Sequence, residues 1–304
     1  MYLVCGEALY DFFLTGSANP GALTFDARAA GSPFNTAIGI VRQGGKSALF
    51  TGVSTDMLGR RLMEVLDAEG VETRYLVRSD RLTTLSLVDL SAGQPAYAFY
   101  GAGAADRSLT EADLPVLGDE ITGLHFGSYS IAAEPVATAL AALAERERHR
   151  FISLDPNIRP TVVPSPDIWR QRIERLLPLA DLVKISSEDL ELVYPGATAE
   201  TIAAEWLGRG LTLIVVTDGG KPVRAFRGAD CISVTPPEVE IVDTVGAGDA
   251  FQATLLARLA ELGDPANAIR TRNNTELEGI LLDAASIAAA NCARRGFDIP
   301  RRAQ

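Results

Sequence analysis

The sequence is poor in the two residue types that build most metal and redox sites. Its 304 residues include only three cysteines and two histidines. Cys5, Cys231 and Cys292 are far apart, so their spacing excludes a CxxC metal site and a disulfide framework and favours a reducing, cytoplasmic location. His125 and His149 form no HExxH pair, which excludes the common zinc-binding helix, and we interpret His125 as a structural residue.

Basic charge and long apolar runs are also scarce. Lysine and arginine total 28 against 39 aspartates and glutamates, and the formal net charge of −11 argues against a nucleic-acid-binding surface. No apolar run reaches about eighteen residues, so we expect no membrane span. Residues 1–11 lack a basic segment and already contain two acidic side chains, so we expect no signal peptide. The composition is that of a soluble globular protein.

Short apolar runs alternate with helix-like segments from residue 121 onward. The predicted strands are 121–126, 151–154, 182–185 and 213–216, and two of the predicted helices between them are 134–148 and 169–177. This alternation is typical of the α/β class, in a three-layer arrangement of a mainly parallel sheet with helices on both faces. Ligands bind beyond the carboxyl ends of such strands, where the sequence places Asp11, Asp155, Lys184 and Thr217.

Two β-rich runs, 84–90 and 96–100, flank the turn-rich residues 91–95 and predict a hairpin. A hairpin cannot join the main parallel ladder, so we expect a small second β-sheet that covers the active site as a lid. We assign residues 1–304 to a single domain, with lid strands inserted at about residues 8–30 and 84–106. An exposed lid sheet is a natural contact between two copies, so we expect a homodimer.

A glycine-rich stretch, residues 243–249, lies between the extended run 239–242 and the helix-like segment 250–261. The first-turn amides of a helix lack internal partners, and Gly246 and Gly248 would let an anion approach them closely. Asp249 has two interpretations, a helix cap or a general base beside a phosphate site. Polar groups from several strand ends converge on the same sheet edge, which favours the base.

Two other loops carry polar side chains at the same edge. Residues 30–35 lead into a helix predicted over 36–43, where Ser32 or Asn35 would cap and Gly31 would permit close ligand approach. In residues 155–160 an acid, an amide and a guanidinium follow a strand. Arg159 would either meet a transferring phosphate or pair with Asp155. A glycine-rich turn at 217–220 and an alanine-rich helix at 281–293 complete the set.

Residues 243–249 read D-T-V-G-A-G-D, which matches the D-T-x-G-A-G-D signature of the ribokinase-like, or pfkB, carbohydrate kinases. The chain resembles this family over almost its whole length, and Gly6, Glu7 and Asp11 resemble its N-terminal element. Within the family, residues 31–37, 155–160 and 183–190 are similar to bacterial fructokinases. Two departures occur. Ala30-Gly31 replaces a glycine pair, and 186–189 reads S-S-E-D in place of N-x-x-E, which leaves the residues that place Mg²⁺ open.

The resemblance implies an ATP- and Mg²⁺-dependent kinase that phosphorylates a sugar hydroxymethyl group, converting fructose to fructose 6-phosphate. Its implied catalytic residues are Asp249 as the base, the amides of Gly246, Ala247 and Gly248 as an anion hole, and Arg159. Its implied substrate-binding residues are Asp11, Gly31 and Asn35. Its implied ATP-binding residues are Lys184, Thr217, Gly219 and Asn291. It also implies a monovalent cation such as K⁺ near Asp243.

Several alternatives stay open at this point. A 2-keto-3-deoxygluconate kinase or a ribokinase would share these motifs, but an acidic sugar would need a basic partner, and the hairpin at 84–100 contains none. Only Arg107 follows it closely, which favours a neutral sugar. A dinucleotide-binding oxidoreductase is excluded because Phe251 replaces the third glycine of its motif. A non-catalytic sugar-binding regulator on the same scaffold would look similar, and the presence of Asp249 favours the enzyme.

Overall fold

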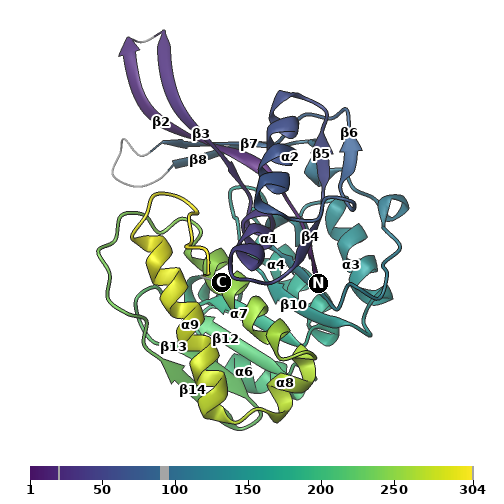
Figure 1. Cartoon of the computed structure of the whole chain (residues 1–304), viewed down its shortest axis with the longest axis vertical. Coiled ribbons are helices and arrows are strands. Elements are labelled where there is room, and N and C mark those ends of the chain that lie inside the picture. The colour runs from purple at the N-terminus through teal and green to yellow at the C-terminus, as the bar shows by residue number, and fades with distance from the viewer. Residues whose placement is uncertain (20, 90–95, 303–304) are drawn as a thin grey trace.

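The computed structural model describes residues 1–19, 21–89 and 96–302. Its centre is an eight-stranded sheet with the strand order β14-β13-β12-β11-β10-β9-β1-β4 (Figure 1). These strands are β1 (Tyr2–Cys5), β4 (Ser47–Phe50), β9 (Gly123–Gly127), β10 (Phe151–Asp155), β11 (Leu182–Ser186), β12 (Leu213–Thr217), β13 (Val223–Arg227) and β14 (Asp230–Val234). All neighbours from β4 to β12 pair in parallel, and β13 and β14 extend the sheet as an antiparallel edge. The predicted mainly parallel sheet is confirmed, whereas β13 and β14 were not predicted.

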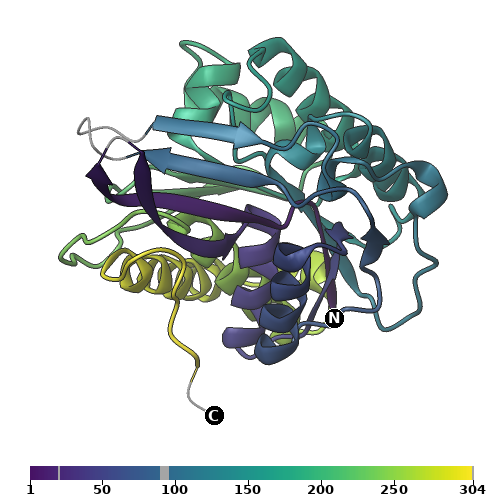
Figure 2. The ribbon, with the colours of Figure 1, turned by 90° about the horizontal axis from the view of Figure 1, so that it is seen from above.

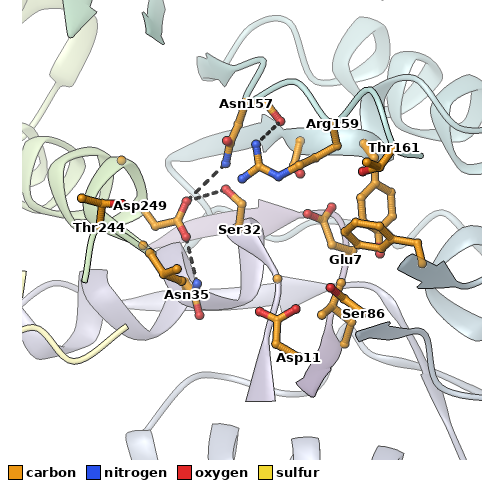
Figure 3. Close-up of a pocket in the computed structure, with 18 of the residues that line it drawn as sticks. Glu7, Asp11, Ser32, Asn35, Ser86, Asn157, Arg159, Thr161, Thr244 and Asp249 are labelled. Atoms are coloured by element: carbon orange, nitrogen blue, oxygen red, sulfur yellow. Dashed lines mark hydrogen bonds between the residues drawn. The ribbon is translucent and has the colours of Figure 1, made fainter. Parts of the chain in front are cut away.

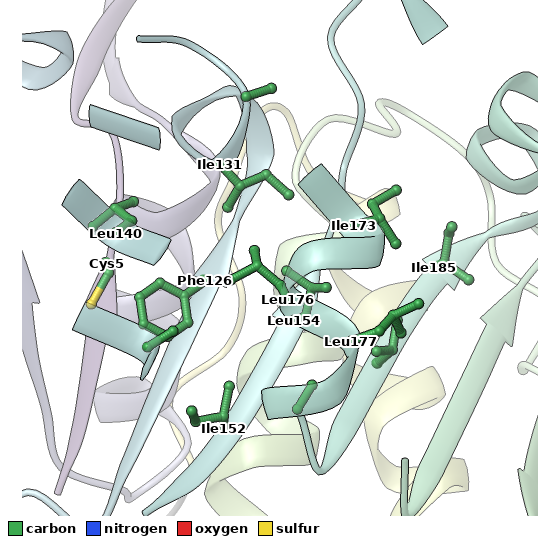
Figure 4. Close-up of a cluster of buried hydrophobic side chains, with 14 of the residues drawn as sticks. Cys5, Phe126, Ile131, Leu140, Ile152, Leu154, Ile173, Leu176, Leu177 and Ile185 are labelled. Atoms are coloured by element: carbon green, nitrogen blue, oxygen red, sulfur yellow. The ribbon is translucent and has the colours of Figure 1, made fainter. Parts of the chain in front are cut away.

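Helices cover both faces of this sheet because its strands are apolar on both sides. Side chains of a strand alternate between faces, so Leu3 and Cys5 pack with one group of helices and Tyr2 and Val4 with the other. The first group is α3 (Val136–Arg146), α4 (Pro166–Leu176), α5 (Ser187–Val193) and α6 (Ala199–Gly208). The second is α1 (Ser32–Arg42), α2 (Met57–Glu69), α7 (Ala247–Glu261), α8 (Pro265–Thr271) and α9 (Asn274–Cys292). Figure 2 shows the teal helices and the purple and yellow helices on opposite sides of the strands, and Figure 4 shows the first core.

Several helices begin earlier than the sequence predicts. Helices α1 and α4 start with a proline in the first turn, where a missing amide hydrogen costs no bond. Helix α9 starts at Asn274, because the Asn273 side chain accepts a hydrogen bond from the Glu276 amide. Residues 239–242 form no strand. None of the helices in the described ranges has the length and apolarity to cross a membrane.

A second sheet has the order β3-β2-β7-β8 and consists of β2 (Leu9–Asn19), β3 (Ala22–Ala30), β7 (Leu85–Asp89) and β8 (Ala96–Tyr100). We call it the lid sheet. Strand β2 leaves directly from the end of β1, and Figure 1 shows β2 and β3 projecting away from the main body. The turn expected at residues 91–95 lies outside the described residues. A two-stranded sheet of β5 (Gly52–Ser54) and β6 (Val77–Ser79) was not predicted.

Candidate active site

A pocket of about 500 Å³ lies between the carboxyl ends of the parallel strands and the lid sheet (Figure 3). We call it the first pocket. Its volume is in the range of small-molecule sites. Seven of the eight implied catalytic and substrate-binding residues line it together: Asp11, Gly31, Asn35, Arg159, Gly246, Gly248 and Asp249. The structure therefore brings the predicted catalytic and sugar-binding segments to one place.

Asp249 is the third residue of α7 and is 6% exposed. One carboxylate oxygen accepts a hydrogen bond from Ser32 Oγ at 2.7 Å, and the other accepts one from Asn35 Nδ2 at 2.8 Å. The N-cap of α7 is Gly246, with no side-chain capping bond, so the interpretation of Asp249 as a helix cap is wrong. The structure leaves its carboxylate facing the pocket, in a position suited to a base.

Burial governs the acidity of Asp249. It raises the pKa of this carboxyl, while the hydrogen bonds from Ser32 and Asn35 and the charge of Arg159 act in the opposite direction. The prediction that Ser32 or Asn35 caps α1 is wrong, because both side chains donate to Asp249 instead and the N-cap is Gly31. A raised pKa makes Asp249 a stronger proton acceptor than an exposed aspartate.

Gly31 makes this arrangement sterically possible. Its φ of 117° lies in the region that favours glycine, and a Cβ at this position would stand 2.7 Å from the Glu7 carbonyl oxygen. The close approach of residues 7 and 31 sets the start of α1, and the first turn of α1 carries Ser32 and Asn35 to Asp249. The glycine at 31 is therefore required by the backbone as well as by the pocket.

The first turn of α7 presents free amide groups. Gly246 has a left-handed φ of 75°, and it lines the pocket with Gly248. Within the described part of the chain, the amides of Gly246, Gly248 and Asp249 have no hydrogen-bond acceptor, whereas the Ala247 amide donates to the Thr244 carbonyl at 3.2 Å. Unpaired amides at a helix N-terminus attract anions. The anion-hole role of Ala247 stays a prediction, because an anion bound by the Ala247 amide would have to compete with the Thr244 carbonyl for the same hydrogen.

Lys184 lies behind this turn, in contact with neither pocket surface. Its ammonium group pairs with Asp155 at 2.8 Å, and the two side chains are 5% and 2% exposed. The ammonium also lies 2.9 Å from the point where a Cβ of residue 248 would stand. The proposed pairing of Arg159 with Asp155 is wrong. Arg159 instead donates to the carbonyl oxygens of residues 157 and 158 and lines the first pocket.

The S-S-E-D element begins α5. Ser186 Oγ accepts a hydrogen bond from the Asp189 amide at 3.0 Å, and an Asp189 carboxylate oxygen accepts one from the Ile158 amide at 3.2 Å. Burial, followed by the charge of Asp155, raises the pKa of Asp189 to about 6. Glu188 lines the first pocket. No set of three or more His, Cys, Asp or Glu side chains forms a metal cage in the ranges that the structure describes.

A second pocket of about 560 Å³ lies on the other side of residues 244–248. Thr244 and Gly248 line both pockets. The walls of the second are mostly small or apolar side chains from the segment 236–241 and from α9, including Val239, Ile241, Ala285, Ala288, Ala289 and Cys292. The predicted Thr217 and Gly219 line it as well. Two neighbouring pockets that share a helix N-terminus are suited to a transfer between two bound molecules.

Two further predicted residues support the loop between the pockets. Asn291 is fully buried, donates to the Val245 carbonyl at 2.8 Å and accepts from the Asp298 amide at 2.9 Å. It lies outside the lining of the second pocket. Both carboxylate oxygens of Asp243 accept backbone amide hydrogens, from Val245 at 3.0 Å and from Gly296 at 2.8 Å. The predicted ATP contact of Asn291 and cation contact of Asp243 stay predictions.

Sequence reasoning missed Asn157, Ser86 and the direct role of Glu7 in the pocket lining. Glu7 directly follows β1, so its position beyond a strand end was a usable signal. Asn157 Nδ2 donates a hydrogen bond to Asp249 Oδ1 at 3.4 Å. The backbone of Asn157 has a left-handed φ of 40°, and no sequence pattern indicated this conformation. His125, interpreted as structural, is buried 3.2 Å from Ser153 Oγ, and burial lowers its pKa to about 3.

A base-like carboxylate and free helix amides between two pockets define a phosphotransferase that acts on an alcohol group. The family model of the pfkB family carbohydrate kinases matches residues 2–303, and the chain belongs to this family. It is 41% identical to a fructokinase of Rhizobium leguminosarum bv. trifolii over 260 residues, which cover 85% of this chain and 79% of that protein.

Two solved structures extend this likeness to three dimensions. The fructokinase of Xylella fastidiosa with bound ATP has a TM-score of 0.88 at 28% identity, covering 97% of this chain and 92% of that one. A fructokinase double mutant from Vibrio cholerae O395, in a fructose, ADP and potassium ion bound form, has a TM-score of 0.86 at 26% identity, covering 97% and 93%. The predicted family and the ribokinase-like α/β fold are confirmed.

Proposed function

We propose that the protein is an ATP- and Mg²⁺-dependent fructokinase that makes fructose 6-phosphate. The observation that carries the proposal is the position of Asp249, whose carboxylate faces a sugar-sized pocket in the same helical turn as the unpaired Gly246 and Gly248 amides. The family match and the fructokinase relatives support fructose as the acceptor. In this assignment the first pocket holds fructose and the second holds ATP.

Asp249 takes the proton from the 6-hydroxyl of fructose as that oxygen attacks the γ-phosphorus of ATP. The new P–O bond forms while the bond between the γ-phosphorus and the bridging oxygen breaks, and ADP leaves with that electron pair. Ser32 and Asn35 hold the carboxylate in place. The Gly246 and Gly248 amides and the Arg159 guanidinium stabilise the charge on the transferring group.

The second pocket suits the nucleotide, since its small apolar side chains can contact both faces of an adenine ring. Bound Mg²⁺ neutralises phosphate charge, and it is usually held by one or two carboxylates together with the phosphates. Glu188 lines the first pocket and Asp189 lies one residue further, so these carboxylates fit that role. Lys184, held by Asp155, acts on the phosphates from behind the helix turn.

The monovalent cation site remains part of the proposal. The potassium ion in the Vibrio cholerae fructokinase structure supports K⁺ here. The Gly296 amide donates a hydrogen bond to the Asp243 carboxylate, so this acidic side chain and the turn at residues 295–296 lie next to each other. The test is the dependence of fructose turnover on K⁺ concentration, with choline chloride used to keep the ionic strength constant. Turnover that does not change with K⁺ would remove the site from the proposal.

A homodimer through the lid sheet and a cytoplasmic location complete the proposal. Leu23 and Tyr100 on the lid sheet are 59% and 62% exposed, which is apolar surface that a second copy would cover. The three free cysteines support a reducing compartment. Light scattering after size-exclusion chromatography tests the dimer, and Leu23→Glu should shift it to a monomer.

The experiment that tests the function is a coupled ADP-release assay with fructose, ribose, 2-keto-3-deoxygluconate and adenosine as acceptors. We expect the highest kcat/KM with fructose. A higher kcat/KM with ribose or 2-keto-3-deoxygluconate would favour the alternative kinases. Fructose binding in calorimetry without turnover of any of the four acceptors would favour a non-catalytic sugar-binding regulator.

A further inference from the structure

The first pocket has a polar end that the phosphoryl-transfer steps do not use. Figure 3 shows Glu7, Asp11 and Ser86 grouped on the side away from Asp249. They come from three different places, the end of β1, the start of β2 and the lid strand β7. Their convergence therefore depends on the lid sheet lying over the main sheet.

Glu7 is a buried carboxyl whose hydrogen bonds from the protein come from serine hydroxyls and from its own backbone amide. It is 1% exposed, and its Oε2 accepts from Ser130 Oγ at 2.6 Å. Burial raises the pKa of Glu7 to about 7. A carboxyl in such a place is costly unless its oxygens are bonded. The cavity surface at Glu7 offers room for a partner from a bound molecule.

Ser86 is an independent indication of a ligand at the same end. The residue is completely buried against bulk solvent and lines the first pocket. Its hydroxyl has no hydrogen bond of normal geometry among the described residues, although it lies close enough to the Asp11 carboxylate to lower the pKa of that group. Most buried hydroxyl groups in proteins have a partner. A ligand hydroxyl in the pocket would supply one.

The charge at this end is negative. Four carboxylate side chains line the first pocket, namely Glu7, Asp11, Glu188 and Asp249, and Arg159 is the only basic side chain among the described residues of the lining. Arg107, the basic residue that follows the lid hairpin in sequence, instead stacks over the Tyr129 ring at 4.6 Å. A carboxylate or phosphate on the remote end of a sugar would face Glu7 and Asp11, with Arg159 as the single basic side chain among the described lining residues to offset them.

We propose that Glu7 and Ser86, beside Asp11, form a specificity subsite that binds hydroxyl groups of a neutral sugar and excludes sugars with an anionic group at that end. This inference rests on the proposed function and adds the class of acceptor and two residues that select it. A site that hydrogen-bonds a substrate hydroxyl discriminates strongly against ligands that cannot make the bond.

The test compares Glu7→Gln and Ser86→Ala with the wild-type enzyme. Fructose binding is measured by calorimetry without ATP, and kcat and KM are measured for fructose and for 2-keto-3-deoxygluconate. At pH 8 the Glu7 carboxyl is mostly charged. Exchange of this charged acceptor for the weaker neutral amide oxygen of glutamine is expected to raise the fructose Kd and KM of Glu7→Gln by about 10- to 100-fold, with kcat within about threefold of wild type. Ser86→Ala should raise both constants by about 3- to 10-fold. The preference for fructose over the keto acid should fall about tenfold or more in Glu7→Gln.

Two matched control variants distinguish an effect on sugar binding from an effect on protein stability. Glu147→Gln makes the same change at a buried glutamate held by Arg146 and Arg150 at the end of α3, and it should leave the fructose KM unchanged. Thr36→Val removes another buried hydroxyl that has no hydrogen bond of normal geometry to any described residue, and it lies outside the pocket lining. Ser86→Ala and Thr36→Val should both keep the melting temperature of wild type or raise it, and only Ser86→Ala should weaken fructose binding.

Unchanged fructose affinity and unchanged preference in both pocket variants, with a wild-type enzyme that turns over fructose, would overturn the subsite and leave the proposed function standing. A wild-type protein that neither binds nor phosphorylates fructose would overturn the function itself. If Glu7→Gln does not fold, Ser86→Ala decides the question, because its effect on affinity is expected without a loss of stability.

Discussion

The two pockets share Thr244 and Gly248 but have different walls. The first is lined by four carboxylates, an arginine, and serine and asparagine side chains, several of which are fixed by hydrogen bonds before any ligand binds. The second is lined mainly by small and apolar residues, among them glycines, prolines, alanines, valines and an isoleucine. A sugar is defined by the directions of its hydroxyl groups, whereas an adenine ring offers flat apolar area. Single substitutions should therefore have large, specific effects in the first pocket and small, graded ones in the second.

Asp249→Asn should have the largest effect. The amide cannot accept the sugar proton, so kcat for fructose should fall by about 10²- to 10⁴-fold. Ser32 and Asn35 can still contact the side chain, and we expect the fructose Kd to change by less than about threefold. Rapid-quench measurement of fructose 6-phosphate, together with calorimetry, tests both numbers. Normal turnover by this variant would show that another group takes the proton.

Many residues of the first pocket can be predicted from the sequence, but some of their contacts cannot. The motif at 243–249 locates Asp249, Gly246 and Gly248, because a glycine-rich loop before a helix leaves the first helix amides free to bind an anion. Parallel strands fix which loops share an edge, so residues 31–35 and 155–159 are also predictable as neighbours. Ser32 donates to Asp249 and does not cap α1. This contact was not predictable, because it depends on how α1 packs against α7.

The lid sheet shows the same limit more clearly. The β-rich pattern of residues 84–100 predicts strands, yet the position of Ser86 over the pocket depends on β7 pairing in parallel with β2, a partner more than sixty residues away. Nothing local in the sequence specifies that pairing. Residue types at strand ends are therefore predictable as a set, whereas residues that reach the pocket from a second sheet require the structure.

Glu7 in the first pocket should make its own contribution to the pH dependence of stability. The folded-state pKa of Glu7 is about 7, above its ordinary value of 4.5, so the folded protein holds this proton more tightly than the unfolded chain does. Its contribution to stability is therefore present at low pH and is lost as the pH rises toward 7. Glutamine stays neutral. The unfolding free energy of Glu7→Gln relative to wild type should rise by about 1–3 kcal/mol between pH 5 and pH 8, measured by urea denaturation.

Glu147→Gln is the matched control for this effect. The hydrogen bonds from Arg150 and Arg146 outweigh the effect of burial and lower the pKa of Glu147, so its carboxyl is already charged at pH 5 and stays charged at pH 8. The difference in unfolding free energy between this variant and wild type should stay nearly constant over that interval. A rising difference in both variants would mean that the pH response belongs to the protein as a whole and is not specific to the pocket.

Ile241→Ala should have the smallest effect and tests the second half of the comparison. Ile241 lines the second pocket and is 67% exposed in the structure, so its removal takes away apolar area without opening the core. We expect the KM for ATP to rise about two- to fivefold, with kcat and the fructose KM unchanged. Val116→Ala, at a residue 91% exposed outside both pockets, should leave all three constants at their wild-type values. A tenfold loss of fructose affinity in Ile241→Ala would show that the pockets do not act separately, because the loop they share at residues 244–248 would then transmit changes from one to the other.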